Sequence, residues 1–396
     1  MECGMQDSSP HAADFASLLE VLHSIGRDVV APHADAVDRD ARFPHEAYVA
    51  LRSQKLLSAY VPVEYGGLGL NITQLAGICE VLGQYCASTA MIFAMHQIQV
   101  GCIVHHALDS EYFRAYVREL VARQYLLASA TTELGIGGDV RSSICAVMVT
   151  GDRFVLEKQA PVISYGEIAD AILVTCRKSE VATRSDQVQV LVKKEDYTLT
   201  RLADWDTLGF RGTCSCGFTL SSHGNAEQIL PGPYAAIHSM TMHPFAHIVW
   251  CSLWLGLASD ALSRARSAVR AEARKNPGVI PLSGTRLAEA DIVLFSMRSG
   301  LQLALADYHR LLSANDSEAF SSFTFAIRIN NLKISCSTFV VDIVSRAMLI
   351  CGIAGYKNDS KLSLGRHLRD AYGASLMVNN DRILGQNATM QIGQRD

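Results

Sequence analysis

The sequence has little charge, little proline and no long apolar run. Only 19% of its 396 residues are charged, the formal net charge is −4, and no run of one sign occurs. Nucleic-acid binding is therefore disfavoured, because it usually requires a basic stripe or cluster. Residues 1–11 lack the basic and then apolar segments of a secretory signal. The longest apolar run, residues 248–258, is far shorter than the roughly 20 residues that span a bilayer. We expect a cytoplasmic protein without membrane spans.

Cysteine is present, but not in a pattern typical of metal sites or disulfide frameworks. Most of the 11 cysteines stand in apolar periodic segments, where they are expected to be small core residues. Cys214 and Cys216 form C-x-C, and no second pair follows at a zinc-like spacing. We expect reduced thiols and no metal.

Hydrophobic periodicity divides the chain into three parts. Helical spacing runs through residues 12–122, short strand-like runs follow, and helical spacing returns from Tyr234, with only 10 prolines to interrupt it. The last part is expected to form helices at about 236–274, 284–313, 318–350, 362–372 and 381–391. We predict an α+β chain with an N-terminal helical domain (1–122), a central β-domain, sandwich or barrel (123–233), and a C-terminal helical bundle (234–396).

The segment from Tyr125 to Asp139, YLLASATTELGIGGD, combines an apolar strand with hydroxyls and glycines. Thr131 and Thr132 end the strand, and the glycines after them allow the backbone to approach a ligand closely. These residues alone fit a cofactor cradle and an ordinary β-turn about equally well.

Seven motifs in order resemble the acyl-CoA dehydrogenase family over nearly the whole chain. Residues 61–70 (VPVEYGGLGL) resemble its P-x-E-Y-G-G-x-G signature, and residues 132–139 (TELGIGGD) its T-E-P-G-A-G-S-D loop. The other five are residues 159–166, similar to K-x-W-I-T-N-G; 208–213, similar to the glycine–arginine turn; 274–278, similar to R-x-x-F-G; 351–356, similar to G-G-x-G-Y; and 369–371, identical to R-D-A.

The resemblance implies FAD bound between the β-domain and the bundle, and oxidation of acyl thioesters at the Cα–Cβ bond. Fixed donors would stabilise the negative charge of the reduced ring. The positions that it assigns to cofactor binding are Ala130, Thr131, Thr132, Gly137, Gly138, Ile163, Ser164, Arg274, Asn276, Gly352 and Asn380.

Arg274 suits the FAD pyrophosphate, because a guanidinium binds phosphate oxygens in a bidentate fork. In the family this arginine comes from the neighbouring subunit, which implies a homodimer or homotetramer. By itself Arg274 also fits a solvated cation near a helix C-terminus.

The catalytic positions depart from the family pattern. Val378 stands where the base is usually glutamate, and Ala246 stands at the alternative base position. Val378 keeps a backbone N–H that polarises the thioester carbonyl in the family. Gly138, Val162 and Leu349 replace the usual serine, tryptophan and glutamine, which implies a smaller and less shielded flavin pocket.

Three side chains are candidates to replace the missing base: His247, His243 and Asp381. Gly138, His243 and His247 are also the predicted substrate-binding residues. Each candidate has a structural alternative: a buried hydrogen-bonded imidazole for His247, a helix-entry residue for His243, and a first-turn acid for Asp381.

We expect an FAD-dependent oxidoreductase acting on an acyl thioester of CoA or of an acyl carrier protein, in specialised-metabolite biosynthesis. The alternative is a flavin monooxygenase on the same fold, supplied by a flavin reductase, because no dinucleotide-binding fingerprint is present. A third possibility is a flavin-binding scaffold whose catalytic site has degenerated.

Overall fold

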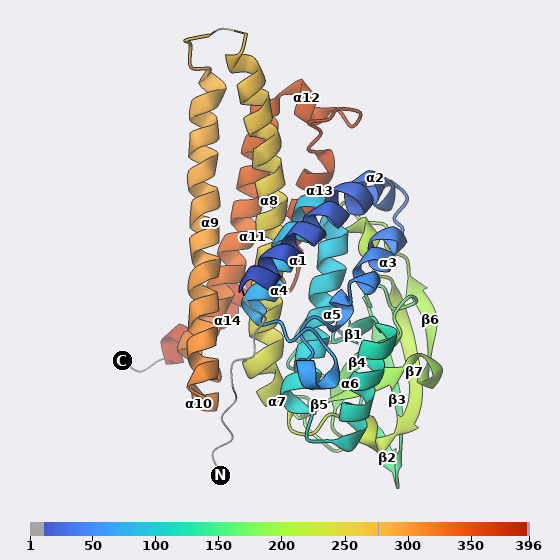
Figure 1. Ribbon diagram of the computed structural model, residues 1–396. Helices are drawn as coiled ribbons and strands as arrows, with labels where there is room; N and C mark the ends of the chain where they lie inside the picture. Colours follow the sequence, from blue (N-terminus) through green and yellow to red (C-terminus); the bar gives the residue numbers. More distant parts are fainter. Residues whose placement is uncertain (1–11, 276, 394–396) are drawn as a thin grey trace.

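The computed structural model describes residues 12–275 and 277–393, in which helices flank a β-region (Figure 1). The N-terminal helices are α1 (Ala12–Ile25), α2 (Ala31–Arg39), α3 (His45–Ser53), α4 (Ile72–Tyr85), α5 (Ala87–His106) and α6 (Glu111–Arg123). Asn71 and Gln74 form a capping box that starts α4. Helix α5 is apolar around most of its circumference and is buried accordingly.

Two sheets make up the central region. A three-stranded sheet has the order β1-β4-β5 and a four-stranded sheet has the order β2-β3-β7-β6. The strands are β1 (Leu127–Ala130), β2 (Met148–Thr150), β3 (Arg153–Ala160), β4 (Ala171–Arg177), β5 (Gln187–Lys193), β6 (Tyr197–Ala203) and β7 (Gly217–Asn225). Sequence patterning missed β6, because this mostly exposed edge strand has only a weak apolar alternation. Strand β1 pairs in parallel with β4, with Leu127 opposite Ala171 and Ala130 opposite Val174.

Long helices form the C-terminal part. They are α7 (Tyr234–Ile237), α8 (His243–Ala273), α9 (Leu282–Ser313), α10 (Ser317–Phe320), α11 (Phe323–Cys351), α12 (Ile353–Tyr356), α13 (Gly365–Leu376) and α14 (Asn380–Gly393). Two predicted helices are divided in the structure. A π-helical turn, His238–Met242, separates α7 from α8, and Ser321–Ser322 separate α10 from α11. In Figure 1, α8, α9 and α11 lie side by side, and the α8–α9 hairpin projects beyond the other elements.

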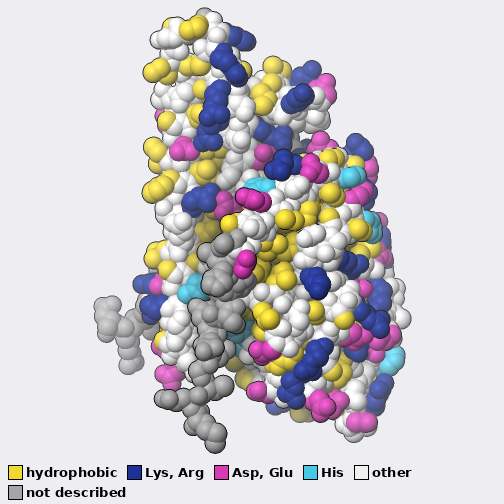
Figure 2. Space-filling view, in the orientation of Figure 1, with side chains coloured by type: hydrophobic (Ala, Val, Ile, Leu, Met, Phe, Trp, Pro, Cys, Tyr) yellow, Lys and Arg dark blue, Asp and Glu magenta, His cyan; other side chains and the backbone are white. Residues whose placement is uncertain are grey.

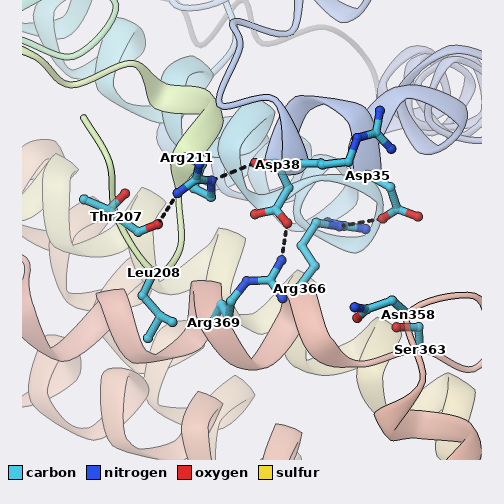
Figure 3. Close-up of a pocket in the computed structure, with 10 residues that line it drawn as sticks. Asp35, Asp38, Thr207, Leu208, Arg211, Asn358, Ser363, Arg366 and Arg369 are labelled. Atoms are coloured by element: carbon cyan, nitrogen blue, oxygen red, sulfur yellow. Dashed lines mark hydrogen bonds and ion pairs between the residues drawn. The ribbon is translucent and has the colours of Figure 1, made fainter. Parts of the chain in front are cut away.

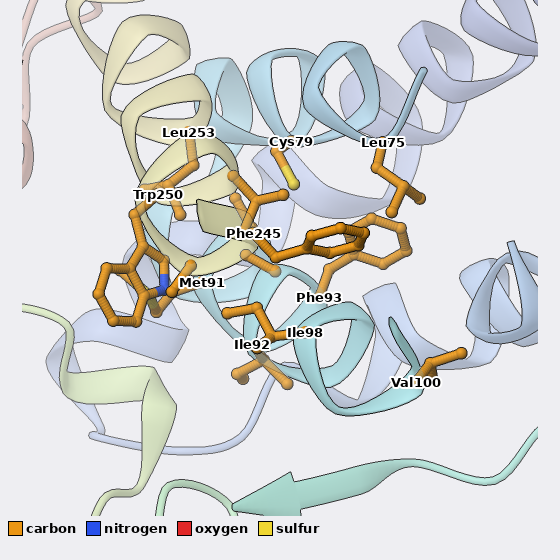
Figure 4. Close-up of a cluster of buried hydrophobic side chains, with 14 of the residues drawn as sticks. Leu75, Cys79, Met91, Ile92, Phe93, Ile98, Val100, Phe245, Trp250 and Leu253 are labelled. Carbon is orange, nitrogen blue, oxygen red and sulfur yellow. The ribbon is translucent and has the colours of Figure 1, made fainter. Parts of the chain in front are cut away.

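The N-terminal helices and the bundle share one core (Figure 4), in which α4 and α5 pack against α8. The α4–α8 crossing is close because glycine stands on both helices. A Cβ on Gly256 would lie 2.0 Å from the Glu80 carbonyl oxygen, and one on Gly83 would lie 2.3 Å from that of Leu253. This crossing fixes the start of α8, and with it the histidines described below.

Three helical segments are long and apolar enough to cross a membrane by length and composition: Ala87–His106, Tyr234–Ala273 and Phe323–Cys351. The expectation that no segment reaches this threshold is wrong, because it counted unbroken apolar runs and these helices contain scattered polar residues. The apolar windows of the first two are 89% buried within the fold, whereas that of Phe323–Cys351 is 39% buried. The first two windows are thus core, and α11 leaves an apolar face uncovered within one chain.

Candidate functional site

The site begins where β1 ends. Thr131 and Thr132 follow the strand, and Thr132 Oγ1 donates to the Val162 carbonyl at 3.3 Å. Gly137 and Gly138 take φ values of +59° and +78°, which other residues rarely adopt. Among the described residues, no backbone bond uses the N–H of Thr132, Gly137 or Gly138. The segment therefore presents backbone N–H groups that are available to donate hydrogen bonds to a ligand.

A buried ion pair supports this segment from behind. The Glu133 carboxylate accepts the N–H groups of Ile144 and Cys145, at 3.0 and 2.6 Å. Lys158 Nζ lies 3.8 Å from that carboxylate and donates to the Thr131 carbonyl at 3.2 Å. Sequence reasoning missed Lys158, whose position is visible only as a charge on the apolar face of an alternating strand. Glu133 and Lys158 hold the segment and have no exposed group with which to react.

Hydroxyl groups line the segment that follows β3. Ile163 is fully buried, and the Ser164 hydroxyl lies 2.8 Å from that of Ser215, which lies 2.8 Å from that of Thr213. Ser164 is itself half-buried. Apolar surface beside accessible hydroxyls and bare N–H groups suits a flat ring with polar edges, so these residues fit the isoalloxazine of a flavin.

The Val378 turn joins α13 to α14. Val378 and Asn379 are consecutive non-glycine residues in the left-handed region, with φ values of +56° and +46°. Val378 is 36% exposed, and its N–H makes no backbone hydrogen bond to any described residue. The next residue, Asn380, accepts a bond from Lys333 Nζ at 2.6 Å and donates to Ser337 Oγ at 3.0 Å.

The Val378 turn and the cradle meet through one ion pair. Arg382, in the first turn of α14, places a guanidinium nitrogen 2.6 Å from a carboxylate oxygen of Asp139. A Cβ on Gly138 would lie 3.2 Å from the same guanidinium. The β-domain and the bundle therefore form two walls of one site. Asp381, by contrast, is exposed, and its backbone N–H bonds to the Asn379 side chain.

His247 is buried and engaged. Its side chain is 2% exposed, and its Nδ1 lies 3.1 Å from the Ile329 carbonyl, to which it donates. Burial, and then the nearby His243, hold its pKa well below the ordinary range of histidine. A neutral imidazole of such low basicity is a poor base, so these observations favour the structural interpretation of His247.

His243 is half-buried and starts a chain of side-chain bonds. Its Nε2 donates to Asn330 Oδ1 at 2.8 Å, Asn330 donates to Asn387, and Asn387 donates to Asn331. Burial lowers the His243 pKa to about 4, and the positive charge of Arg141 contributes. Met242, the residue before His243, accepts a bond from the Gln189 side chain of β5, so the start of α8 contacts the sheet that contains β1. His243 is thus a half-buried imidazole of low basicity near that sheet.

Two predicted cofactor positions, Arg274 and Gly352, do not join the cradle of the same chain. Arg274 is exposed at the tip of α8, and Gly352 lies between α11 and α12, both at the end of the bundle away from β1 (Figure 1). Asn276 lies outside the described residues. This separation agrees with a role toward a second copy of the chain.

A cavity of about 490 Å³ lies where the N-terminal helices, the β-domain and α13 meet (Figure 3). Arg369 pairs with Asp38, Arg366 with Asp35, and Arg211 Nε donates to the Asp38 carbonyl. Asp370, next to Arg369, accepts the Phe210 N–H at 2.7 Å, and burial raises its pKa to about 6. The arginines around this cavity are occupied by such partners, so it is a junction between domains.

Comparison with known proteins agrees with this architecture. Two domain families match: acyl-CoA dehydrogenase, N-terminal domain, over residues 14–125, and acyl-CoA dehydrogenase, C-terminal domain, over residues 239–378. A cyclohex-1-ene-1-carbonyl-CoA dehydrogenase of Geobacter metallireducens is 24% identical over 92% of this chain and 94% of its own.

Two solved structures have the same fold. A butyryl-CoA dehydrogenase from Megasphaera elsdenii superposes with a TM-score of 0.80 at 19% identity, covering 99% of this chain and 100% of the other. FMN-bound TdsC from Paenibacillus sp. A11-2, a dibenzothiophene monooxygenase, gives 0.82 at 19% identity, covering 96% and 98%. The flavin cradle, the order of domains and the matched families agree: this chain belongs to the acyl-CoA dehydrogenase family of FAD-dependent oxidoreductases.

Proposed function

We propose that this protein acts on an acyl thioester of CoA or of an acyl carrier protein, in a biosynthetic pathway of specialised metabolism. The observation that carries the proposal is the free Val378 N–H, held in a left-handed turn that α14 links to the flavin cradle. A backbone donor at that place suits a thioester carbonyl oxygen, on which negative charge grows when the α-proton leaves. FAD, when bound, supplies either acceptance of a hydride or, once reduced, reaction with O₂.

The residues beside the Val378 turn define what this site lacks. Neither Val378 nor Ala246 can accept a proton, and Asp381 lies in an exposed helix turn. His243 and His238 are half-buried imidazoles near the start of α8, stacked with their ring centroids 5.4 Å apart, and His243 Nε2 bonds to Asn330. We propose His243 as a substrate-contacting group and the residue best placed to accept a proton, with slow turnover because of its low pKa.

A second candidate is a monooxygenase supplied with reduced flavin by a reductase. It is favoured by the absence of a carboxylate at Val378 and by Val162, which is smaller than the tryptophan of the family pattern. The likeness to a dibenzothiophene monooxygenase supports it as well. An enzyme of this kind needs no base for an α-proton.

Anaerobic mixing separates the two candidates. The FAD-loaded protein is mixed with a series of straight-chain acyl-CoA thioesters while the flavin absorbance near 450 nm, its usual visible band, is followed. Bleaching without a reductase supports thioester oxidation. No bleaching, followed by O₂ consumption and an oxygenated product when a flavin reductase is added, supports the monooxygenase. A protein that binds no flavin contradicts both.

We also propose that the protein works as a homodimer or homotetramer. Apolar side chains are exposed along the bundle: Ile292, Phe295 and Leu303 of α9, Leu349 of α11, and Ile353 and Tyr356 of α12. Figure 2 shows apolar side chains on the surface over α9. A second copy that covers this face would also bring its Arg274 to a cradle that lacks a cation for the FAD pyrophosphate. The burial of the apolar windows of α5 and α8 within the fold supports the proposed cytoplasmic location.

A further inference from the structure

A buried lysine stands beside the Val378 turn. Lys333, in the middle of α11, is 0% exposed, and its Nζ donates to Asn380 Oδ1 at 2.6 Å. In the part of the chain that the structure describes, no carboxylate lies within ion-pair distance of it, and burial lowers its pKa to about 8. Burying an ammonium without a counter-charge is unfavourable by several kcal/mol. An apolar side chain would fill this position in α11 without that penalty. What the lysine adds here is the hydrogen bond that it donates to Asn380.

The turn that Lys333 supports is strained. L-residues in the left-handed region are strained, and a β-branched valine there is unusual. Val378 and Asn379 adopt this conformation in succession. Backbone strain persists where surrounding contacts over-determine it, and such positions gather at functional sites.

Asn380 carries the restraint to α11. Its Oδ1 accepts from Lys333, and its Nδ2 donates to Ser337 Oγ at 3.0 Å. Ser337 Oγ in turn donates to the Ile334 carbonyl at 2.9 Å, so its lone pairs remain available to Asn380. Both ends of the Asn380 amide are thus tied to one rigid helix. Arg382, two residues later, is tied to Asp139 on the opposite wall.

We propose that Lys333 is a positioning residue that acts through Asn380 to hold the Val378 turn, so that the free Val378 N–H points at the carbonyl oxygen of the thioester. This inference rests on the proposed function for its ligand, but not for the restraint itself. The lysine does not touch the substrate. It sets the orientation of the donor that does.

Hydrogen–deuterium exchange of the FAD-loaded protein tests the restraint without any substrate. Lys333→Met keeps the volume and removes the donor, and Ser337→Ala removes the second tie. We expect the hydrogen-bonded amides of Asn379 and Asp381 to exchange at least ten-fold faster in Lys333→Met, and by a smaller factor in Ser337→Ala, with the rest of the protein unchanged. Thr338→Ala, which removes an exposed hydroxyl on the same helix that donates to the Ile334 carbonyl, is the matched control.

Ligand selectivity tests the orientation of the N–H. Crotonyl-CoA carries the thioester carbonyl and is already desaturated, so it binds without turnover, and its S-(2-butenyl) thioether lacks the carbonyl. We expect the wild type to bind the thioester about ten-fold more tightly than the thioether, as one well-oriented hydrogen bond allows. Lys333→Met should reduce this preference below about three-fold while thioether affinity is kept.

A rescue variant separates positioning from general stability. Asn380→Asp offers Lys333 a carboxylate in place of an amide oxygen but gives up the donor to Ser337, so we expect exchange at Asn379 and Asp381 no faster than in Ser337→Ala and a thioester preference above that of Lys333→Met. In Lys333→Met/Asn380→Asp the carboxylate has no lysine partner, so exchange in the turn should be fast and the thioester preference should be lost. This comparison still holds if Lys333→Met alone folds poorly, because Ser337→Ala and Asn380→Asp keep the lysine.

Two results would overturn the proposal in distinguishable ways. Unchanged exchange and unchanged selectivity in Lys333→Met and Ser337→Ala would show that Lys333 holds nothing at the Val378 turn. A wild type with no preference for the thioester would instead contradict the proposed function, and the assignment of the Val378 N–H with it, even where exchange shows that the turn is restrained.

Discussion

Arg382 and Asp139 join the two walls of the site, with a guanidinium nitrogen 2.6 Å from a carboxylate oxygen, although 243 residues separate them in sequence. Arg382 lies in the helix that begins after Val378, and Asp139 ends the glycine segment of the cradle. The pair therefore sets the distance between the open N–H groups of the β-domain and the Val378 turn of the bundle.

Reversing this pair should affect binding more than stability. The Arg382 and Asp139 side chains are 22% and 44% exposed, so the pair should contribute no more than about 1 kcal/mol to stability. We expect Arg382→Asp to weaken crotonyl-CoA binding several-fold, with a small change in the midpoint of thermal unfolding. Arg382→Asp/Asp139→Arg should recover most of the affinity. Calorimetric titration and thermal unfolding measure both effects, and no recovery in the double variant would argue against the pair as the link.

A carboxylate placed at position 378 should start the dehydrogenation of an acyl thioester or increase its rate. Val378→Glu places a proton acceptor at the end of the turn, and a positioned general base contributes typically 10²–10⁴-fold. We expect flavin reduction by a saturated acyl-CoA to accelerate by at least about ten-fold. Rapid mixing without oxygen measures the rate. Val378→Gln, which has the same shape without the charge, is the control and should show no gain.

Replacing His247 should change stability but not the rate of chemistry. Its Nδ1 bonds to the Ile329 carbonyl in a buried position, so His247→Ala removes this bond and leaves a cavity. We expect a loss of about 1–3 kcal/mol in the free energy of unfolding and less than a ten-fold change in flavin reduction. His243→Ala should slow reduction more and destabilise less. A hundred-fold loss of rate in well-folded His247→Ala would identify His247 as the base after all.

Acid should destabilise the protein through His96. This buried imidazole accepts the Leu127 N–H of β1 at Nδ1 and donates to the Leu57 carbonyl from Nε2, and burial lowers its pKa to about 4. Because the folded-state pKa lies below the unfolded value near 6.5, this contribution is complete above about pH 6.5 and declines as the pH falls toward 4. Its full size is on the order of 3 kcal/mol.

Urea unfolding at pH 7.5 and pH 5 measures this effect. We expect His96→Gln to be less stable than the wild type at pH 7.5 and to lose less of its stability between the two values. An equal loss in both proteins would assign the acid sensitivity to the other buried histidines, such as His105 and His106, whose pKa values burial also lowers to about 4.

Charge on the exposed face of α9 should break the assembly and release the cofactor. Phe295 is 71% exposed within one chain, and Phe295→Glu should yield smaller species in sedimentation and lower FAD occupancy. Val155→Glu is the control, since Val155 is 51% exposed on β3, outside the bundle. Arg274→Ala should lower FAD occupancy without changing the oligomer. An unchanged oligomer in Phe295→Glu would exclude this face as the interface.

The sequence alone determined the order of the domains and the family. Helical and strand periods are local properties, and the glycine segment, the R-D-A triplet and Val378 stand in order along the chain. Sequence also predicted that the usual base is absent, because the resemblance places Val378 and Ala246 at its two positions. It missed β6, since an exposed edge strand buries too few side chains to leave a pattern.

Tertiary structure decided which groups support the site. Lys158 and Lys333 look like ordinary charges in their segments, and only packing shows that one lies behind the cradle and the other beside the Val378 turn. The pairing of Arg382 with Asp139, and the burial that makes His247 a weak base, depend on contacts between residues far apart in sequence. Such contacts leave no local period, because folding alone brings these partners together.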